Sequence, residues 1–279
     1  MAFAWEPYGR SKDRTLYQEL LMKKTLVALS LAAMTLPALA QDKKAPEPDY
    51  TITGNFGLFS DYRFRGISQT SEKPALQGGF DFAHKSGVYL GTWASNVGTW
   101  ANLGGSMEID FYGGFKGSLP MDVGFDIGAI AYEYPGNTAN PSNKTKEWYL
   151  GFSKGPLSYK YSRTTGNWFG IARSSGSNYH DLTATFPVSE KVSLAIHAGK
   201  QDIAGSSQTV NPDYNDYSIG LSLDLGNSLT AGLKYTTVDF KNSGAKGTNG
   251  WFNTAATPGS PANKPLGDDA IVLSIVKTF

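Results

Sequence analysis

Apolar and polar residues alternate with a period of two along most of the chain from residue 50 onward. In the first such stretch Ile52, Phe56 and Leu58 fall on even positions, and Thr51 and Asn55 fall on odd ones. This alternation is typical of a β-strand with one apolar and one polar face. The predicted strands are Tyr50–Arg65, Pro74–His84, Val88–Asn96, Ser106–Lys116, Met121–Tyr134, Lys146–Ser153, Leu157–Thr164, Asn178–Phe186, Val192–Lys200, Tyr214–Leu225, Ser228–Phe240 and Ala270–Phe279.

The connections between these strands alternate between short turns and long loops. Short turns are predicted at 85–87, 117–120, 154–156, 187–191 and 226–227, and long loops at 66–73, 97–105, 135–145, 165–177, 201–213 and 241–269. An even strand number with this alternation is typical of bacterial outer-membrane barrels. We therefore predict an all-β fold over residues 50–279, a transmembrane antiparallel up-and-down β-barrel of about twelve strands. Ten strands is the alternative count.

The composition narrows the choice of fold class. The chain has 32 glycines, 13% aromatic and 18% charged residues, no cysteine and a net charge of +1. The lack of cysteine excludes disulfides and thiolate metal sites. A mean hydropathy of −0.30 argues against a helical membrane protein. A soluble lipocalin-like barrel would bury its apolar residues, and a secreted β-sandwich of this size would be expected to carry disulfides, so both are less suited to the sequence.

An export signal is predicted near the N-terminus. Met22–Ala40 has two early lysines, a short apolar stretch and small residues at Ala38 and Ala40. This is the pattern of a cleavable signal peptide, with Gln41 as the first mature residue. The Lys- and Pro-rich segment 41–49 is then predicted to be a periplasmic tail.

The first segment, Met1–Leu21, does not suit an export signal. Its acidic residues Glu6, Asp13 and Glu19 are atypical ahead of a positively charged signal start. We interpret residues 1–21 as an upstream extension and expect translation to begin at Met22.

The last residue favours a membrane barrel over a soluble one. Phe279 ends a strand with apolar residues at alternate positions, which is the form of the insertion signal that outer-membrane barrels present to the barrel-insertion machinery. Together with the export signal, it predicts a location in the bacterial outer membrane, in contact with its lipid.

Five sequence motifs, in order along the chain, point to a family. They are Ser60–Thr70 (SDYRFRGISQT), Pro74–Asp81 (PALQGGFD), Ser86–Asn96, Glu108–Phe115 and Tyr132–Gly136. The series resembles the TorF family of bacterial porins, most sharply from Asn55 to Gly136. The resemblance implies an outer-membrane barrel with a pore, no catalytic residues and no settled substrate.

Charged residues on the polar strand faces are the candidate site. Asp61, Arg63 and Arg65 lie two residues apart, so a strand would point them to one face. They either form a charged constriction or pair with acids of nearby strands, and we favour pairing because an unpaired charge in a narrow lumen is costly. The pore-lining candidates are Asp61, Arg63, Arg65, Asp81, Glu108, Asp110, Asp122 and Asp126. Acids outnumber bases in this set, which predicts a weak preference for cations.

No catalytic site is predicted. His180 and Asp181 are adjacent, but neighbouring residues of a strand face opposite sides and cannot act together. The aromatic residues, including Tyr62, Trp93, Trp148, Tyr149 and Phe279, are interpreted as girdles at the membrane interfaces. We therefore predict a porin-like channel for passive diffusion of small hydrophilic solutes or ions, not an enzyme, with no cofactor, metal or nucleic-acid partner. The alternatives are a plugged structural barrel and, less favoured, an outer-membrane enzyme.

Overall fold

The computed structural model describes residues 48–98, 106–138, 142–205, 212–241 and 266–279. The predicted upstream extension, the export signal and its cleavage residues Ala38, Ala40 and Gln41 lie outside these ranges, as does most of the predicted tail.

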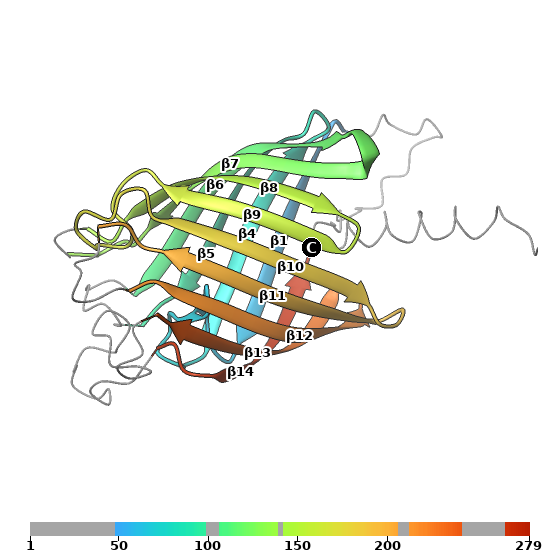
Figure 1. Cartoon of the computed structure of the whole chain (residues 1–279). Coiled ribbons are helices and arrows are strands. Elements are labelled where there is room, and N and C mark those ends of the chain that lie inside the picture. Colours follow the sequence, from blue (N-terminus) through green and yellow to red (C-terminus); the bar gives the residue numbers. More distant parts are fainter. Residues whose placement is uncertain (1–47, 99–105, 139–141, 206–211, 242–265) are drawn as a thin grey trace, which may run out of the picture.

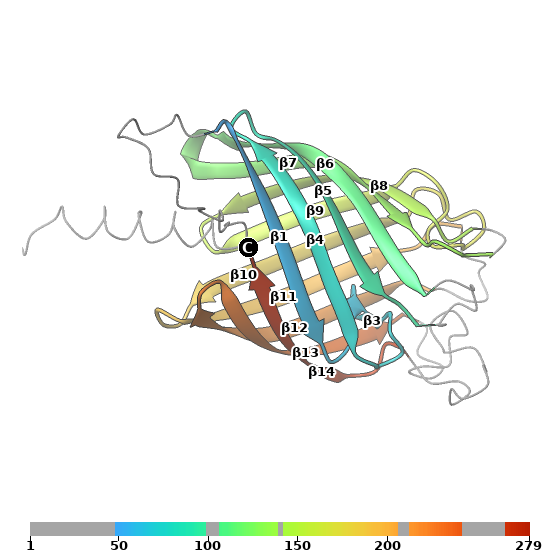
Figure 2. The ribbon, with the colours of Figure 1, turned by 180° about the vertical axis from the view of Figure 1, so that it is seen from behind.

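Twelve antiparallel strands form one closed barrel, which confirms the predicted fold (Figures 1 and 2). Each strand pairs with its neighbours in the chain, and β14 closes the barrel by pairing with β1. The barrel strands are β1 (Tyr50–Phe59), β4 (Ala75–His84), β5 (Val88–Asn96), β6 (Met107–Leu119), β7 (Val123–Glu133), β8 (Thr145–Lys154), β9 (Leu157–Thr164), β10 (Asn178–Pro187), β11 (Val192–Asp202), β12 (Tyr214–Gly226), β13 (Leu229–Phe240) and β14 (Ala270–Thr278).

The two ends of the barrel differ. The short turns lie at the end where β1 begins and β14 finishes, which we call the turn end; the long connections lie at the opposite loop end (Figure 1). One turn contains the 3-10 helix η1 (Pro120–Asp122). In the described part of the chain, no helix has the length and apolar character needed to cross a membrane.

The outer surface of the barrel is apolar all the way round. Each strand exposes at least one large apolar side chain: Ile52, Phe80, Leu90, Phe111, Ile127, Phe152, Leu157, Leu182, Ile196, Leu221, Leu233 and Leu273. A continuous belt of this kind is far larger than the apolar patches of soluble monomers. The belt therefore suits a lipid environment, and β14 pairs with β1, the two strands that an open sheet would leave at its edges.

Glycines on the inner wall make room for tyrosines of the neighbouring strand. A Cβ atom on Gly91 would collide with the ring of Tyr112, and one on Gly128 would collide with Tyr149. The Tyr149 hydroxyl also hydrogen-bonds to that of Tyr89. Small and large residues thus alternate across the wall, and several glycines serve packing rather than backbone flexibility.

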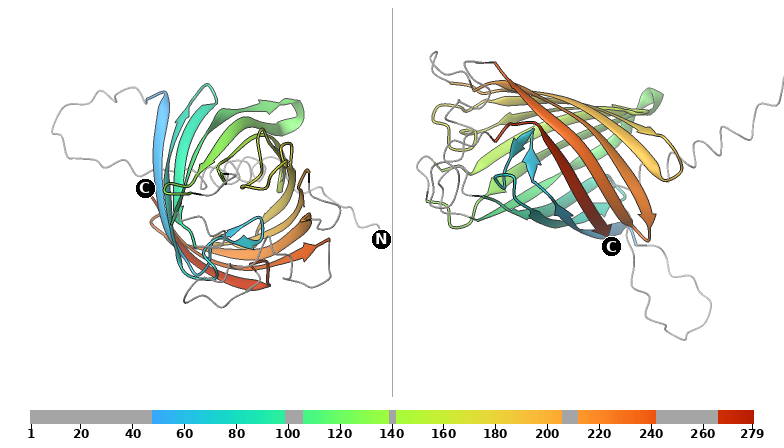
Figure 3. Two further views of the ribbon diagram at one scale, coloured as in Figure 1. Left: turned by 90° about the vertical axis from the view of Figure 1, so that its left-hand side faces the viewer. Right: turned by 90° about the horizontal axis from the view of Figure 1, so that it is seen from below.

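The first strand is shorter than predicted. It ends at Phe59 instead of Arg65, and the chain then turns into the lumen as a small hairpin, β2 (Arg63–Phe64) and β3 (Ile67–Ser68). Arg65 and Gly66 form its two-residue turn, with φ of 46° and 80°. Positive φ at both positions is the geometry of tight hairpin turns, and glycine favours it. The view along the barrel shows the hairpin inside the ring of strands (Figure 3, left).

Candidate functional site: a lumenal hairpin and the cavity beside it

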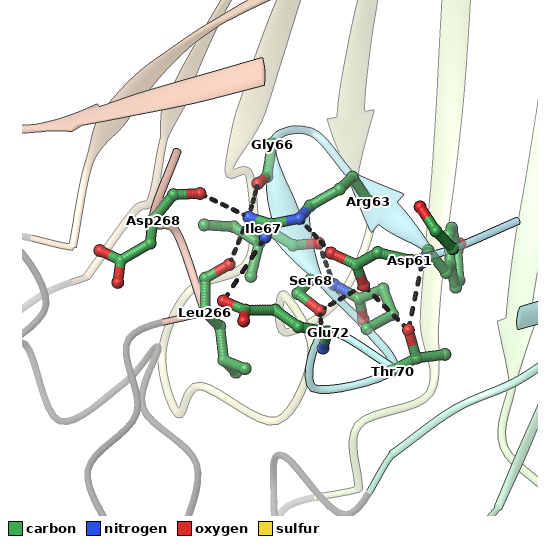
Figure 4. Close-up of polar contacts among 12 residues, drawn as sticks. Asp61, Arg63, Gly66, Ile67, Ser68, Thr70, Glu72, Leu266 and Asp268 are labelled. Atoms are coloured by element: carbon green, nitrogen blue, oxygen red, sulfur yellow. Dashed lines mark hydrogen bonds and ion pairs between the residues drawn. The ribbon is translucent and has the colours of Figure 1, made fainter. Parts of the chain in front are cut away.

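An ion pair holds the base of the hairpin together. Arg63 pairs with Asp61, and both side chains are almost fully buried. The second carboxylate oxygen of Asp61 accepts hydrogen bonds from the hydroxyls of Ser68 (2.7 Å) and Thr70 (2.9 Å) (Figure 4). The hydrogen bonds to Asp61 therefore come from within the hairpin segment itself, which makes the segment a preorganised unit.

Arg63 also ties the hairpin to the chain segment that precedes β14. Its Nη1 donates to the carbonyl oxygens of Gly66 (3.2 Å), Leu266 (2.9 Å) and Asp268 (2.8 Å) (Figure 4). The amide of Ser68 donates to the carbonyl of Leu266 as well. These bonds attach the hairpin to one side of the barrel at the loop end.

Arg65, at the hairpin tip, reaches the other side of the lumen. Its guanidinium donates to both carboxylate oxygens of Glu147 on β8, at 3.1 and 2.6 Å, and to Oε1 of Gln201 on β11 at 2.8 Å. It also lies over the rings of Phe64 and Tyr179. Burial lowers the pKa of Arg65, but the Glu147 carboxylate outweighs burial and raises it overall. A charged, bidentate contact therefore pins the tip across the lumen.

A second contact fixes the hairpin against the wall formed by β6 and β7. The hydroxyls of Tyr62 and Tyr134 each donate to the Glu108 carboxylate, both at 2.8 Å. Burial first, and then the charge of Glu108, raise the pKa of both tyrosines well above the ordinary value. Both phenols therefore keep their protons and act as donors that satisfy the buried carboxylate.

Apolar side chains fill much of the lumen at the loop end. Ile67 of the hairpin belongs to a buried cluster that also contains Trp168, Ile171, Ile203, Tyr214, Val238, Phe240 and Leu266. Its members come from strands and from three long connections. On the other side of the hairpin, Phe64 packs edge-on against Tyr132 and Phe169. The hairpin and these connections therefore share a buried apolar core at the loop end.

The structure gives the predicted arginines other partners than those expected. Arg63 pairs with Asp61, which was predicted to lie beside it on a strand, and Arg65 pairs with Glu147, which was not a candidate. The expected ladder with Asp81, Glu108 and Asp110 does not form, because the hairpin leaves the strand register that this prediction assumed. Both arginines pair with acids, as predicted, but the predicted partners on nearby strands are wrong.

The other predicted acids occupy three different settings. Asp81 and Asp126 accept hydrogen bonds from Tyr112 and Tyr89, both at 2.6 Å. Asp110 is buried beside the hairpin, 6% exposed. Asp122 is exposed in the turn η1, so the prediction that it lies on a strand facing the lumen is wrong. The turn extends past Pro120 to Asp122, whereas the alternation of apolar and polar residues predicts that the strand begins at Met121.

The interpretation of the aromatic residues as girdles is only partly correct. Trp148 and Phe279 are exposed on the outer surface. Tyr62 and Tyr149 are buried inside the barrel, and Trp93 packs edge-on against Tyr62 with ring centroids 5.2 Å apart. The lumen therefore uses aromatic residues that sequence alone had placed in the membrane interface.

A cavity of about 440 Å³ lies against the hairpin tip and the inner wall of the barrel. Its charged or titratable lining residues are Arg63, Arg65, Glu147, Lys160, Asp181, His197, Asp216 and Lys234. Four tyrosines also line it: Tyr112, Tyr132, Tyr149 and Tyr179. Apart from the two arginines, sequence reasoning singled out none of these ionisable residues as pore-lining. Alternation along the strands could have identified the two lysines. Lys160 and Lys234 alternate with exposed apolar residues, so they must face the lumen.

The cavity wall holds a histidine between two carboxylates. Asp181 lies 3.2 Å from Nδ1 of His197, and Asp216 lies 2.9 Å from its Nε2. His180, in contrast, contacts Tyr159 on the outer surface, so it faces away from Asp181 as the alternation predicts. No group of acidic or histidine side chains suited to a metal ion occurs in the described ranges.

Comparisons with known proteins support the fold. The structure of the KdgM porin superposes with a TM-score of 0.51 at 6% identity, covering 81% of this chain and 99% of that one. The NanC porin (8% identity, 82% and 98% covered) and an outer-membrane channel from Pseudomonas putida F1 (12% identity, 86% and 100% covered) both give 0.48. The likeness to KdgM shows a shared barrel fold.

The sequence comparisons identify a family. No curated protein matches this chain. Residues 43–279 match the family described as "Bacterial protein of unknown function (Gcw_chp)". That description does not test the resemblance to the TorF family, which stays a prediction. The match extends over most of the sequence, so the chain belongs to the Gcw_chp family.

Proposed function

We propose that the protein is an outer-membrane, porin-like channel for passive diffusion of small hydrophilic solutes or ions, as the TorF resemblance also implies. The observation that carries this proposal is the contrast between the two faces of the barrel. The outer face is an apolar belt, and the inner wall carries charged and hydroxyl groups around a cavity of about 440 Å³. A polar lumen inside an apolar outer face is the arrangement of porins, whose lumen is a water-filled channel.

The apolar belt supports a position in the outer membrane, with the turn end on the periplasmic side. Outer-membrane barrels have short periplasmic turns and longer extracellular loops, and this barrel has the same asymmetry. The exposed C-terminal Phe279 suits recognition by the barrel-insertion machinery. The hairpin would then narrow the lumen toward the cell exterior.

A plugged structural barrel is the second candidate, and a specific observation favours it. The Ile67 cluster and the Arg65–Glu147 contact fill the lumen at the loop end. Twelve strands lie between barrels filled by side chains and wide aqueous porins, so the strand number does not decide between the two functions.

Planar-bilayer recording of the refolded protein in potassium chloride separates the two candidates. Discrete conductance steps are expected for a channel. If the wild type shows none and Arg65→Ala shows them, the barrel is plugged by the hairpin. If neither protein conducts, the channel proposal fails.

A further inference from the structure

The acids of the cavity wall already have partners. Glu147 accepts from Arg65 and from Tyr132 at 3.3 Å. Asp181 contacts His197 and accepts from Thr183 at 2.9 Å. The third acid, Asp216, accepts from Tyr179 at 2.9 Å and contacts His197. A solute entering the cavity therefore meets carboxylates whose hydrogen-bonding capacity is largely used.

The two lysines of the cavity are in the opposite condition. Lys160 on β9 and Lys234 on β13 both lie on the inner wall, since the flanking Leu233 and Tyr235 of β13 and Tyr159 of β9 are exposed outside. Among the described residues, neither ammonium group forms an ion pair or a hydrogen bond. Each therefore offers its donors to the cavity.

The surroundings of Lys160 and Lys234 bring some negative charge near them without neutralising either by contact. Asp181 is the cross-strand neighbour of Lys160, and its Oδ1 is shared by His197 and Thr183. Lys160 also lies 5.7 Å from the ring centre of Tyr149. Among the described residues, the wall thus presents two ammonium groups that no carboxylate contacts.

The position of the lysines places them on a path through the barrel. On β13, Lys234 lies nearer the turn end than Val238, which packs against Gly66 of the hairpin turn. A solute that passes the hairpin would next reach the lysines. The cavity volume lies within the range of small-ligand sites.

We propose that this cavity binds small hydrophilic solutes that carry an anionic oxygen group, a carboxylate or a phosphate, through Lys160 and Lys234. The proposal rests on the proposed channel function and names the class of its solute. It reverses the cation preference predicted from sequence. The predicted acids do not line the cavity, whose carboxylates come from Glu147, Asp181 and Asp216.

Titration calorimetry of the full chain in detergent tests the site without requiring conduction. The probes are sodium gluconate, inorganic phosphate and sorbitol, which resembles gluconate with an alcohol in place of the carboxylate. Gluconate or phosphate should bind and sorbitol should bind at least about tenfold more weakly, because charge-assisted hydrogen bonds are lost. Comparing the two anions tells a carboxylate site from a phosphate site.

Lysine variants then locate the binding. Lys160→Gln and Lys234→Gln should each raise the Kd about tenfold or more. Lys116→Gln is the matched control, since Lys116 faces the lumen, is paired with Asp126 and does not line the cavity. Equal binding of sorbitol and gluconate, or equal effects of all three variants, would overturn the proposal.

Bilayer recording distinguishes failure of this proposal from failure of the channel function. Anion binding that depends on both lysines, in a barrel that does not conduct, retains the site and removes the channel. Conductance without lysine-dependent anion binding retains the channel and removes the site.

Discussion

Replacing Arg65 with methionine tests whether the hairpin tip is pinned across the lumen. Methionine keeps much of the length of the side chain and removes its charge. The substitution leaves the Glu147 carboxylate, whose side chain is 2% exposed, without its cation. Among the described residues, Tyr132 then remains as its one donor, at 3.3 Å.

The structure sets the size of the expected effect. Removing one partner of a buried ion pair typically costs about 3–5 kcal/mol, because the other charge stays buried. Arg65→Met together with Glu147→Gln removes both charges, so the double variant should cost less than the single one. Arg163→Met is the matched control, since Arg163 is exposed on β9 and its guanidinium donates to the Tyr161 hydroxyl at 3.4 Å.

The loss of stability can appear in the barrel or in the hairpin, and two assays separate these cases. Urea unfolding in lipid vesicles reports the barrel, and hydrogen exchange at the Gln69 amide, which donates to the carbonyl of Tyr62 at 2.7 Å, reports the hairpin. The hairpin can undock while the barrel stays folded, so exchange should accelerate most. Single-channel conductance should rise at the same time. Unchanged exchange and unchanged conductance would refute the pinning of the tip.

Three further predictions concern the barrel wall. Leu221→Arg should destabilise the barrel in lipid by about 2–4 kcal/mol, and Ser222→Arg, on the lumen side, by less; equal losses in urea unfolding would mean that the faces are misassigned. Gly199→Ala should cost about 1–3 kcal/mol because its Cβ would collide with a neighbouring tyrosine hydroxyl, and the better-accommodated Gly220→Ala should cost less in the same assay. Deleting Phe279 should reduce the amount of barrel assembled in outer membranes, measured by heat-modifiable gel mobility, and normal assembly would remove its role as an insertion signal.

The barrel was predictable because each strand carries its own signal. Alternation in a segment such as Tyr214–Leu225 depends only on local facing of lipid and lumen, and the structure has β12 at Tyr214–Gly226. Alternating loop lengths then fixed the up-and-down order. No long-range information was needed for either step.

The hairpin was not predictable from alternation, because a strand folded into the lumen also alternates. Tyr62 and Phe64 continue the even-numbered apolar pattern of β1, but they pack against Trp93 and Tyr132 inside the barrel. Gly66 was the available signal of a turn. It was placed at the start of a loop, whereas Arg65 and Gly66 together form the hairpin turn.

The pairing of charges was beyond sequence because it depends on barrel closure. Arg65 and Glu147 are 82 residues apart, on a hairpin and on β8. His197 meets Asp181 and Asp216 only because β10, β11 and β12 are neighbours in one register. The odd or even position of a residue in its strand predicts whether it faces the lumen. Only the strand register of the closed barrel determines which of these residues contact one another.

The hairpin motif Ser60–Thr70 offers few groups that could select solutes, because its charged side chains already have partners. The Asp61 carboxylate is engaged by Arg63, Ser68 and Thr70, and the Arg65 guanidinium by the wall. A solute that passed the hairpin would find few free polar groups on it. Its polar contacts would have to come from the facing strands. In the proposed channel, the hairpin would therefore set the width of the passage, and the lysines of β9 and β13 would set which solutes are held there.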